Sequence, residues 1–213
     1  MTESTIQPLV QALLAGDLHR SVELCRALRS DGVDAERIVA EGVETAMERL
    51  DARCTVEQFN LLEIMLTGRS VMGVMKELYP QDAPSRRPKG TVVLASLEGD
   101  VHDLGKNIVK MVLTAAGYRV ADGGRDCSLD RLTDIAEREG ADAVGISGLL
   151  TMVAGQVRQV RGRLAERGLD GVRILAGGAA LKQAAPEQLD VDYVAQTAFD
   201  GLHYLESLRE TGS

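Results

Sequence analysis

The sequence predicts an α/β protein in which a four-helix bundle precedes a five-stranded, parallel, doubly wound sheet. Up to about Leu78 the apolar residues recur only with the 3.6-residue period of amphipathic helices. From Thr91 onward, β-branched apolar runs alternate with helical patterns, as in a parallel sheet with right-handed crossovers. Residues 80–90 hold three prolines and several charges, which is typical of a linker. The expected parts are a helical domain at 1–80, a linker at 81–90 and an α/β domain at 91–213.

The helical half is expected to contain four helices joined by short connections, as in a small bundle. Asp17 and Asp34 are residue types that cap helices, and each precedes an apolar periodic stretch. Thr55 with Gln58 forms a capping box for the fourth helix, which runs to about Tyr79.

The α/β half is expected to alternate five strands with five helices. The strand order 2-1-3-4-5 would place a crevice between the carboxyl ends of the first and third strands, where such sheets bind ligands. The strands are expected at 91–97, around 118–122, and at 142–147, 172–176 and 192–195, and the helices at roughly 104–116, 129–139, 153–167, 180–189 and 199–209.

The composition argues against several classes of protein. A net charge of −8 disfavours non-specific binding to nucleic acid, which needs a basic face. No apolar run reaches the roughly 18 residues of a membrane span, and the amino terminus lacks the layout of a signal peptide. Cys25, Cys54 and Cys127 are isolated, so they form neither a disulfide framework nor a CxxC metal pair. We therefore expect a cytoplasmic protein.

The most informative segment is Glu98–Asn107, which joins the first strand of the α/β half to its first helix. Asp100 and His102 are alternate residues, so in an extended loop both side chains leave the same face of the backbone. A carboxylate there can hold one imidazole nitrogen while the other coordinates a metal. Gly105 permits a bulky group to approach the helix start, and Asp103 suits the helix dipole there.

Small residues also gather at the ends of the third and fourth strands. Ser147, Leu149 and Thr151 follow the third strand, and Gly177-Gly178 ends the fourth. Each glycine taken alone could serve only a tight turn. Their joint position at one edge of the sheet favours a ligand slot.

These residues resemble a known signature. The pattern Asp100-x-His102-x-x-Gly105, followed by Ser147-x-Leu149 and Gly177-Gly178, is similar to that of cobalamin-binding corrinoid proteins of methyltransferase systems and of the cobalamin module of methionine synthase. The helical first half matches as well, so the resemblance covers nearly the whole chain. It implies a helical cap joined to a Rossmann-like (flavodoxin-like) domain, with cobalamin as methylcobalamin or a related corrinoid.

The resemblance also implies roles for particular residues. His102 would bind cobalt in place of the cofactor's own base, the base-off/His-on state, and Asp100 would hold the other imidazole nitrogen. The displaced nucleotide tail would enter a slot beside Gly105, with Ser147 bonded to its base. Phe59, Leu62 and Leu66 of the cap would face the corrin. The full set of expected cofactor-binding residues is Asp100, His102, Asp103, Gly105, Ser147, Leu149, Thr151, Gly177, Gly178, Phe59, Leu62 and Leu66, with His102 as the metal ligand.

The sequence departs from the family pattern in several places, which include Leu62-Glu63-Ile64 in place of a Pro-Glu-Leu segment and Thr197 in place of the usual aspartate near the carboxyl terminus. The serine that extends the Asp–His relay in methionine synthase is Val153 here, which cannot hydrogen-bond, and Thr151 is a candidate substitute. The segment Asp122–Asp126 differs from the usual aliphatic Asp-Leu-Gly pattern, and the sequence alone offers no physical account of it.

The resemblance implies a methyl carrier that takes a methyl group from a substrate-specific methyltransferase and passes it to an acceptor methyltransferase. A reductive activase is a further candidate partner. We expect a non-catalytic corrinoid subunit rather than a self-sufficient enzyme, because no barrel of about 250 residues accompanies the α/β half. The alternative is a cobalamin-dependent sensor or regulator, responsive to light or a ligand, that acts through a protein partner. The resemblance assigns no catalytic residue, and the charge and hydropathy of the chain predict neither a nucleic-acid nor a membrane partner.

Overall fold

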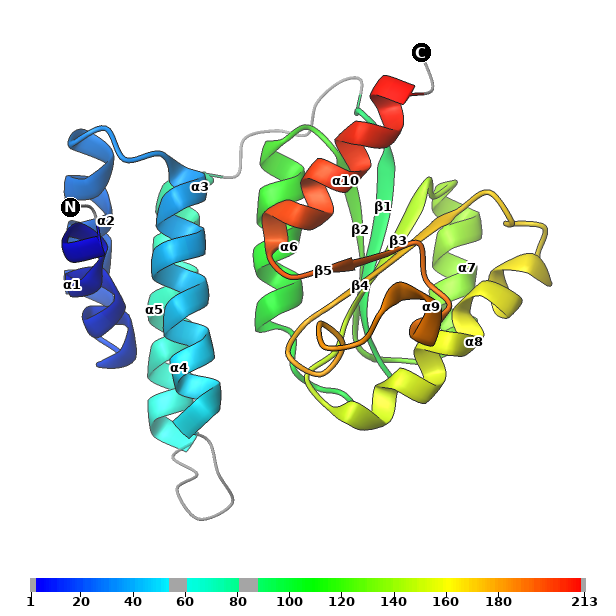
Figure 1. Ribbon diagram of the computed structural model, residues 1–213, viewed down its shortest axis with the longest axis horizontal. Helices are drawn as coiled ribbons and strands as arrows, with labels where there is room; N and C mark the ends of the chain where they lie inside the picture. The colour runs from blue at the N-terminus through cyan, green and yellow to red at the C-terminus, as the bar shows by residue number, and fades with distance from the viewer. Residues whose placement is uncertain (1–2, 54–60, 81–87, 212–213) are drawn as a thin grey trace. The chain divides into compact units, whose positions relative to one another are not determined.

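The computed structural model describes residues 3–53, 61–80 and 88–211 (Figure 1). The chain divides into two compact units, Met1–Gln81 and Asp82–Ser213, each with internal contacts of its own. In the described parts no helix is both long and apolar enough to cross a membrane.

The first unit is entirely helical in its described residues. Asp17 accepts the Arg20 N–H at 2.9 Å and Asp34 accepts the Arg37 N–H at 2.7 Å, which confirms both predicted caps. The predicted capping box at Thr55 lies outside the described residues. The elements are α1 (Glu3–Leu14), α2 (Leu18–Ser30), the contiguous α3 (Ala35–Ile38), π-helical η1 (Val39–Glu44) and α4 (Thr45–Arg53), and α5 (Leu61–Leu78).

The π-helical turn η1 was not expected from the periodicity. It contains Gly42, where a Cβ atom would lie 3.1 Å from Leu9 Cδ2 of α1. The missing side chain therefore allows α1 to pack closely at this point. The fully buried Leu9, Leu13, Ile38 and Met75 belong to the core of this unit.

The second unit is a five-stranded parallel sheet in the order β2-β1-β3-β4-β5, which confirms the predicted topology. All seven residues of β1 are buried, as expected for a strand covered on both faces. The strands are β1 (Thr91–Leu97), β2 (Arg119–Cys127), β3 (Ala143–Ser147), β4 (Arg173–Gly177) and β5 (Tyr193–Ala195).

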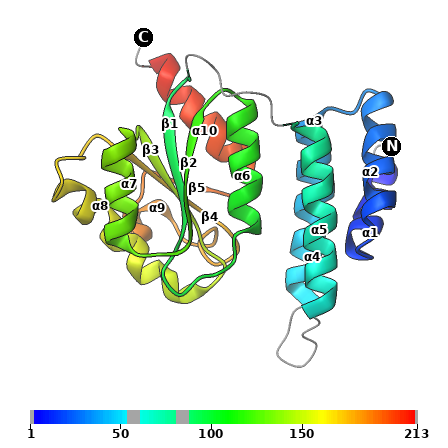
Figure 2. The ribbon, with the colours of Figure 1, turned by 180° about the vertical axis from the view of Figure 1, so that it is seen from behind.

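Helices cover both faces of this sheet, α6 and α10 on one side and α7, α8 and α9 on the other (Figures 1 and 2). Two buried apolar clusters match these layers: one includes Leu132 and Val157, and the other includes Leu113 and Leu205. The elements are α6 (Leu104–Ala115), α7 (Leu129–Glu139), the 3₁₀ turn η2 (Thr151–Val153), α8 (Ala154–Ala165), α9 (Pro186–Leu189) and α10 (Ala198–Thr211).

Two predicted boundaries in this unit were wrong. The helix expected at 180–189 is confined to Pro186–Leu189, because Ala185 precedes a proline and is held extended at φ −72° and ψ 151°. Strand β2 continues to Cys127, beyond the predicted end near 122, through a stretch that contains two glycines.

Replacing Gly178 by alanine is expected to lower the free energy of unfolding by roughly 1–3 kcal/mol. The new Cβ would lie 2.5 Å from the Gly148 carbonyl oxygen, and the φ of +95° disfavours any L side chain. The matched control is Gly162→Ala in α8, where a Cβ meets nothing within 4 Å. That change should raise stability by up to about 1 kcal/mol. Urea unfolding followed by circular dichroism measures both, and equal effects would contradict the packing role of Gly178.

Candidate functional site

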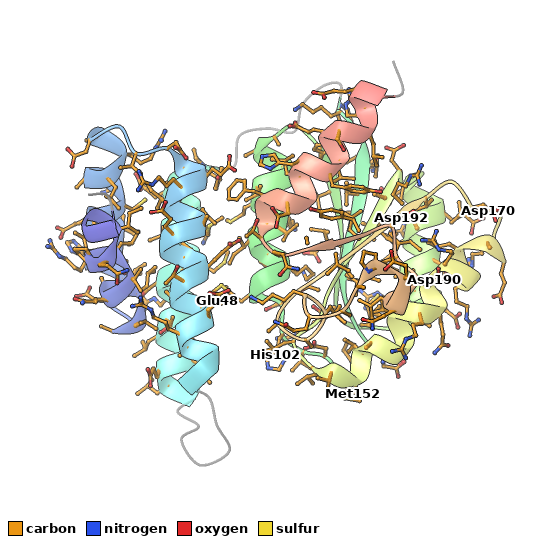
Figure 3. All side chains as sticks on the ribbon, in the orientation of Figure 1. Glu48, His102, Met152, Asp170, Asp190 and Asp192 are labelled. Carbon is orange, nitrogen blue, oxygen red and sulfur yellow. The ribbon has the colours of Figure 1, made fainter. Side chains whose placement is uncertain are left out.

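The loop between β1 and α6 lies at the carboxyl edge of the sheet, where the sequence places the ligand crevice. Figure 3 shows His102 of this loop and Met152 of η2 along the same edge of the α/β unit. The backbone N–H of Asp100 donates to the Leu97 carbonyl at 2.9 Å, and the buried Ser96 hydroxyl donates to the His102 carbonyl at 2.8 Å. The loop is therefore bonded back onto the end of the strand that carries it.

Asp100 is a completely buried carboxylate with four N–H donors. Its Oδ1 accepts the backbone N–H of His102 at 3.0 Å and lies 2.8 Å from His102 Nδ1. Its Oδ2 accepts the backbone N–H groups of Leu149 at 2.7 Å and Leu150 at 3.3 Å. Burial, the largest single influence, raises the pKa of this carboxyl, but these hydrogen bonds together hold the pKa below its ordinary value of 3.8.

The imidazole of His102 is oriented by this carboxylate and is open to solvent on its other side. Its side chain is 49% exposed, whereas that of Asp100 is 0% exposed. Because an ionised carboxylate can only accept, Nδ1 donates the proton, which in the neutral ring leaves the Nε2 lone pair unprotonated. The structure thus presents one basic nitrogen outward at the sheet edge.

Exposed apolar side chains accompany this nitrogen in the same loops. Val101, Leu149 and Met152 are 55%, 37% and 64% exposed, and the methyl group of Met152 lies over Gly99. Val101 and Met152 had no role in the sequence-based interpretation, although an apolar residue in a strand-end loop was a signal that could have identified them. A large apolar ligand with one open coordination position fits this surface.

The described residues contain no group of three or more His, Cys, Asp and Glu side chains able to hold a metal ion. A metal bound at His102 would therefore need further ligands of its own, as the ring nitrogens of a corrin provide. The single imidazole and the apolar side chains beside it fit such a group.

Gly105 and Ser147 leave room between the start of α6 and the end of β3. A Cβ on Gly105 would lie 3.5 Å from the Ser147 hydroxyl, so any larger side chain would fill this space. Within the described residues the Ser147 hydroxyl makes no hydrogen bond, which leaves it available to a ligand.

The glycines at the end of β4 have a different local role. The Gly148 N–H donates to the Gly177 carbonyl at 2.9 Å, and the carbonyl oxygen of Gly148 occupies the space where a side chain on Gly178 would begin. At Gly178 the missing side chain lets the ends of β3 and β4 come together, whereas a Cβ on Gly177 would lie 3.3 Å from the Ala195 carbonyl oxygen of β5.

Three further residues named in the sequence analysis, Thr151, Val153 and Asp103, make no side-chain hydrogen bond to Asp100 or His102 in the described structure. Thr151 is exposed in η2, and in the described structure its hydroxyl does not bond Asp100, whose Oδ2 accepts the Leu149 and Leu150 amides instead. Val153, at the serine's position, is fully buried in the core. Asp103 is the N-cap residue of α6 but makes no side-chain capping hydrogen bond.

The remaining expected residues belong to the helical unit. Leu62 is 65% exposed, and both Leu62 and Leu66 line a pocket with Leu14, Ala15 and Glu63. Phe59 lies outside the described residues.

A buried lysine anchors the start of α6 to β2. Lys106 is 2% exposed, and its ammonium donates to Asp122 Oδ1 at 2.6 Å and to the side chain of Asn107 at 3.0 Å. Burial raises the pKa of Asp122, but hydrogen bonds from Lys106, the Gly124 N–H and Lys110 outweigh it and lower the pKa to about 2. The Asp122 carboxylate therefore stays ionised at neutral pH.

Comparison with known proteins identifies relatives of the whole chain. Residues 90–202 match the B12 binding domain family. A corrinoid protein of Desulfitobacterium hafniense (strain Y51) is 30% identical over 207 residues, which cover 95% of this chain and 96% of that protein. The dimethylamine corrinoid protein of Methanosarcina barkeri is 28% identical over 94% of this chain and 95% of its own length.

A solved structure shows the same likeness in three dimensions. The monomethylamine corrinoid protein of Methanosarcina barkeri superimposes with a TM-score of 0.81 at 25% identity, covering 97% of this chain and 100% of that one. The predicted resemblance to corrinoid proteins and the predicted fold class are both confirmed.

Replacing Asp122 by asparagine should lower the free energy of unfolding at neutral pH by about 1–3 kcal/mol, because the buried Lys106 ammonium loses its ionic partner. The folded-state pKa of about 2 lies below the ordinary 3.8, so the stabilisation is complete above about pH 4 and is lost as the pH falls toward 2. The difference between the two proteins should therefore shrink over that interval in urea titrations.

The matched control is Asp130→Asn, which removes an exposed carboxylate that lies 3.5 Å from Arg163. Its effect at neutral pH should stay within about 0.5 kcal/mol. A constant difference between wild type and Asp122→Asn from pH 7 to pH 2 would contradict the role given to the Lys106–Asp122 pair.

Proposed function

Because the chain belongs to the B12-binding family of corrinoid proteins, we propose that it is a methyl carrier that holds its corrinoid in the base-off/His-on state. The observation that supports this most directly is the His102 imidazole, which is oriented by a buried carboxylate and open at Nε2. A bound corrinoid supplies a cobalt centre that accepts a methyl group and gives it up again. The protein contributes the axial nitrogen, its orientation and an apolar surface.

In this proposal His102 Nε2 would hold the cobalt of the bound corrinoid. Asp100 keeps the ring proton on Nδ1 and fixes the plane of the imidazole, since its other hydrogen bonds hold the carboxylate in place. Val101, Leu149 and Met152 exclude water from beside the ligand. Each of these contributions favours a defined cobalt–nitrogen bond over a solvated imidazole.

The nucleotide tail of the corrinoid is assigned to the space beside Gly105 and Ser147. The Ser147 hydroxyl, at the end of β3, would donate to the base of the tail, and the absence of a side chain on Gly105 leaves room for that base. Gly177 and Gly178 would shape the neighbouring loop. Asp103 and Thr151 would contact the corrinoid at the edge of the sheet.

The helical unit is assigned the methyl-bearing face of the corrin. Exposure of Leu62, and the pocket that Leu62 and Leu66 line, support this assignment for α5. From the sequence, Phe59 is proposed to face the corrin as well.

The proposed partners are a substrate-specific methyltransferase that loads the cobalt and an acceptor methyltransferase that unloads it, with a reductive activase as a third. The relatives named above are corrinoid proteins, two of them designated for dimethylamine and monomethylamine. These designations favour a methylated amine as the methyl donor and favour the carrier over the sensor.

Replacing His102 by alanine should abolish the nitrogen splitting in the electron paramagnetic resonance spectrum of the bound cobalt(II) corrinoid, because the axial imidazole is lost. Asp100→Asn should reduce the split fraction and shift the reduction potential, because the asparagine NH₂ group must face an N–H donor. His203→Ala, in α10, is the control and should retain the wild-type spectrum. A wild-type spectrum from His102→Ala would contradict the proposal that His102 binds the cobalt.

The carrier is expected to keep one oligomeric state when it is loaded with methylcobalamin or adenosylcobalamin, in the dark or under light. Its cobalt-bound methyl group should pass to an acceptor thiol only when a methyltransferase is added. Size-exclusion chromatography and the visible spectrum follow the two properties. A light-driven change of oligomeric state without methyl transfer would favour the sensor instead.

A further inference from the structure

The segment that departs from the family pattern, Asp122–Asp126, forms a bulged end of β2 beside the His102 loop. The parallel pairing with β1 shifts register twice: Leu94 pairs with Asp122, Ala95 with Gly124 and Leu97 with Cys127. Each shift inserts an extra residue in β2, and such bulges bend a strand and redirect its side chains.

The backbone conformation of the bulge and its closeness to β1 explain why Gly123 and Gly124 occur in it. A Cβ on Gly123 would lie 3.0 Å from Ala95 Cβ and 3.2 Å from the Leu94 carbonyl oxygen of β1, so the common leucine does not fit. Gly124 has a φ of +82°, and Asp126 has a φ of +52° in the left-handed region, which costs free energy for a residue with a side chain. The chain therefore keeps a strained aspartate where a glycine would be relaxed.

The strained conformation gives Asp126 two hydrogen bonds to the loop that holds His102. Asp126 Oδ1 accepts the Gly99 N–H at 2.8 Å, and the Asp126 N–H donates to the Asp100 carbonyl at 3.0 Å. Gly99 and Asp100 form the turn that leads directly into Val101 and His102. Gly99 is itself left-handed, with a φ of +85°. The same turn is also held by the Asp100 N–H, which donates to the Leu97 carbonyl, and by the Gln156 side chain, which donates to the Glu98 carbonyl at 2.8 Å.

We propose that Asp126 is a positioning residue for the axial histidine. It holds the Gly99–Asp100 turn from the β2 side, while the Leu149 and Leu150 amides hold the Asp100 carboxylate from the β3 side. With both ends fixed, Asp100 has one orientation in which to set the imidazole plane. The identity of the positioned atom as a cobalt ligand rests on the proposed function, whereas the clamp on the turn does not.

Three substitutions separate the hydrogen bond from the backbone strain. Asp126→Ala removes the acceptor and keeps a side chain in the left-handed region. Asp126→Gly also removes the acceptor but relieves the strain, and Asp126→Asn keeps a carbonyl acceptor on a residue type that tolerates this conformation. Asp190→Ala is the matched control, because Asp190 is the other described non-glycine residue with positive φ, at +53°, and it precedes β5 at the opposite edge of the sheet.

The first measurement uses the protein without cofactor. Amide hydrogen exchange at Gly99, followed by nuclear magnetic resonance, should be faster in Asp126→Ala and Asp126→Gly than in the wild type. Asp126→Asn should restore most of the protection. Asp190→Ala should alter global stability but leave Gly99 at the wild-type rate.

The second measurement uses the protein loaded with cobalt(II) corrinoid. Asp126→Ala and Asp126→Gly should lower the fraction with nitrogen splitting and raise the Kd for hydroxocobalamin about two- to tenfold, the equivalent of one hydrogen bond. Asp126→Asn should recover the wild-type fraction, which a merely structural role would not require.

The outcomes distinguish this inference from the proposed function. Wild-type exchange at Gly99 in both Asp126→Ala and Asp126→Gly would overturn the clamp, whatever the cofactor does. Faster exchange with an unchanged nitrogen-split fraction and Kd would overturn the positioning role while the ligation by His102 stands. If the wild-type protein shows no nitrogen splitting at all, the proposed function and the positioning role both fail, and exchange at Gly99 alone decides whether Asp126 holds the turn.

Discussion

The buried Asp100 carboxylate is the interaction on which the site depends. A carboxylate removed from water is costly unless hydrogen bonds replace its hydration, and here four N–H groups do so. Two of these donors belong to His102 and two to the loop after β3. One buried charge therefore joins two strand-end loops, and the orientation of the imidazole follows from how completely that charge is satisfied.

The sheet topology makes this arrangement available. In the order β2-β1-β3-β4-β5 the loop after β1 has a neighbouring strand end on each side. Bonds reach it from the β3 side through the Leu149 and Leu150 amides and from the β2 side through Asp126. Because parallel strands end at the same edge, residues far apart in sequence can act on a single imidazole. The exposed Val101 and Met152 then complete an apolar surface that suits the flat ring of a corrinoid.

The protein departs from the relay of methionine synthase without losing the buried pair. Val153 packs in the core of the α/β unit, and the backbone amides of Leu149 and Leu150 bond Asp100 Oδ2. An amide donor cannot pass a proton onward, so the pair ends at the carboxylate in this chain. This difference concerns how the proposed cobalt ligand, His102, is held, and in the proposal the corrinoid itself remains the source of reactivity.

The sequence by itself determined both described helix caps and the Asp-x-His pair, because each depends on residue type at a short, regular spacing. The alternation of strand and helix patterns determined the fold class, and the strand order followed from the order that doubly wound sheets of five strands commonly take. The cofactor was indicated by the resemblance of these motif residues to those of corrinoid proteins. Tertiary structure decided what lies around Asp100. The Leu149 amide that bonds Asp100 is 49 residues away from it in the sequence. Every residue except proline has such an amide, so no sequence pattern predicts this bond.

The same reason applies to the bulge of β2. Gly123 is explained by the closeness of β1, which leaves no room for a side chain, and Asp126 by the loop after β1, with which this left-handed residue makes two hydrogen bonds. A local sequence pattern indicates which residues favour a helix or a strand. Contacts between distant backbone groups exist only once the sheet has formed.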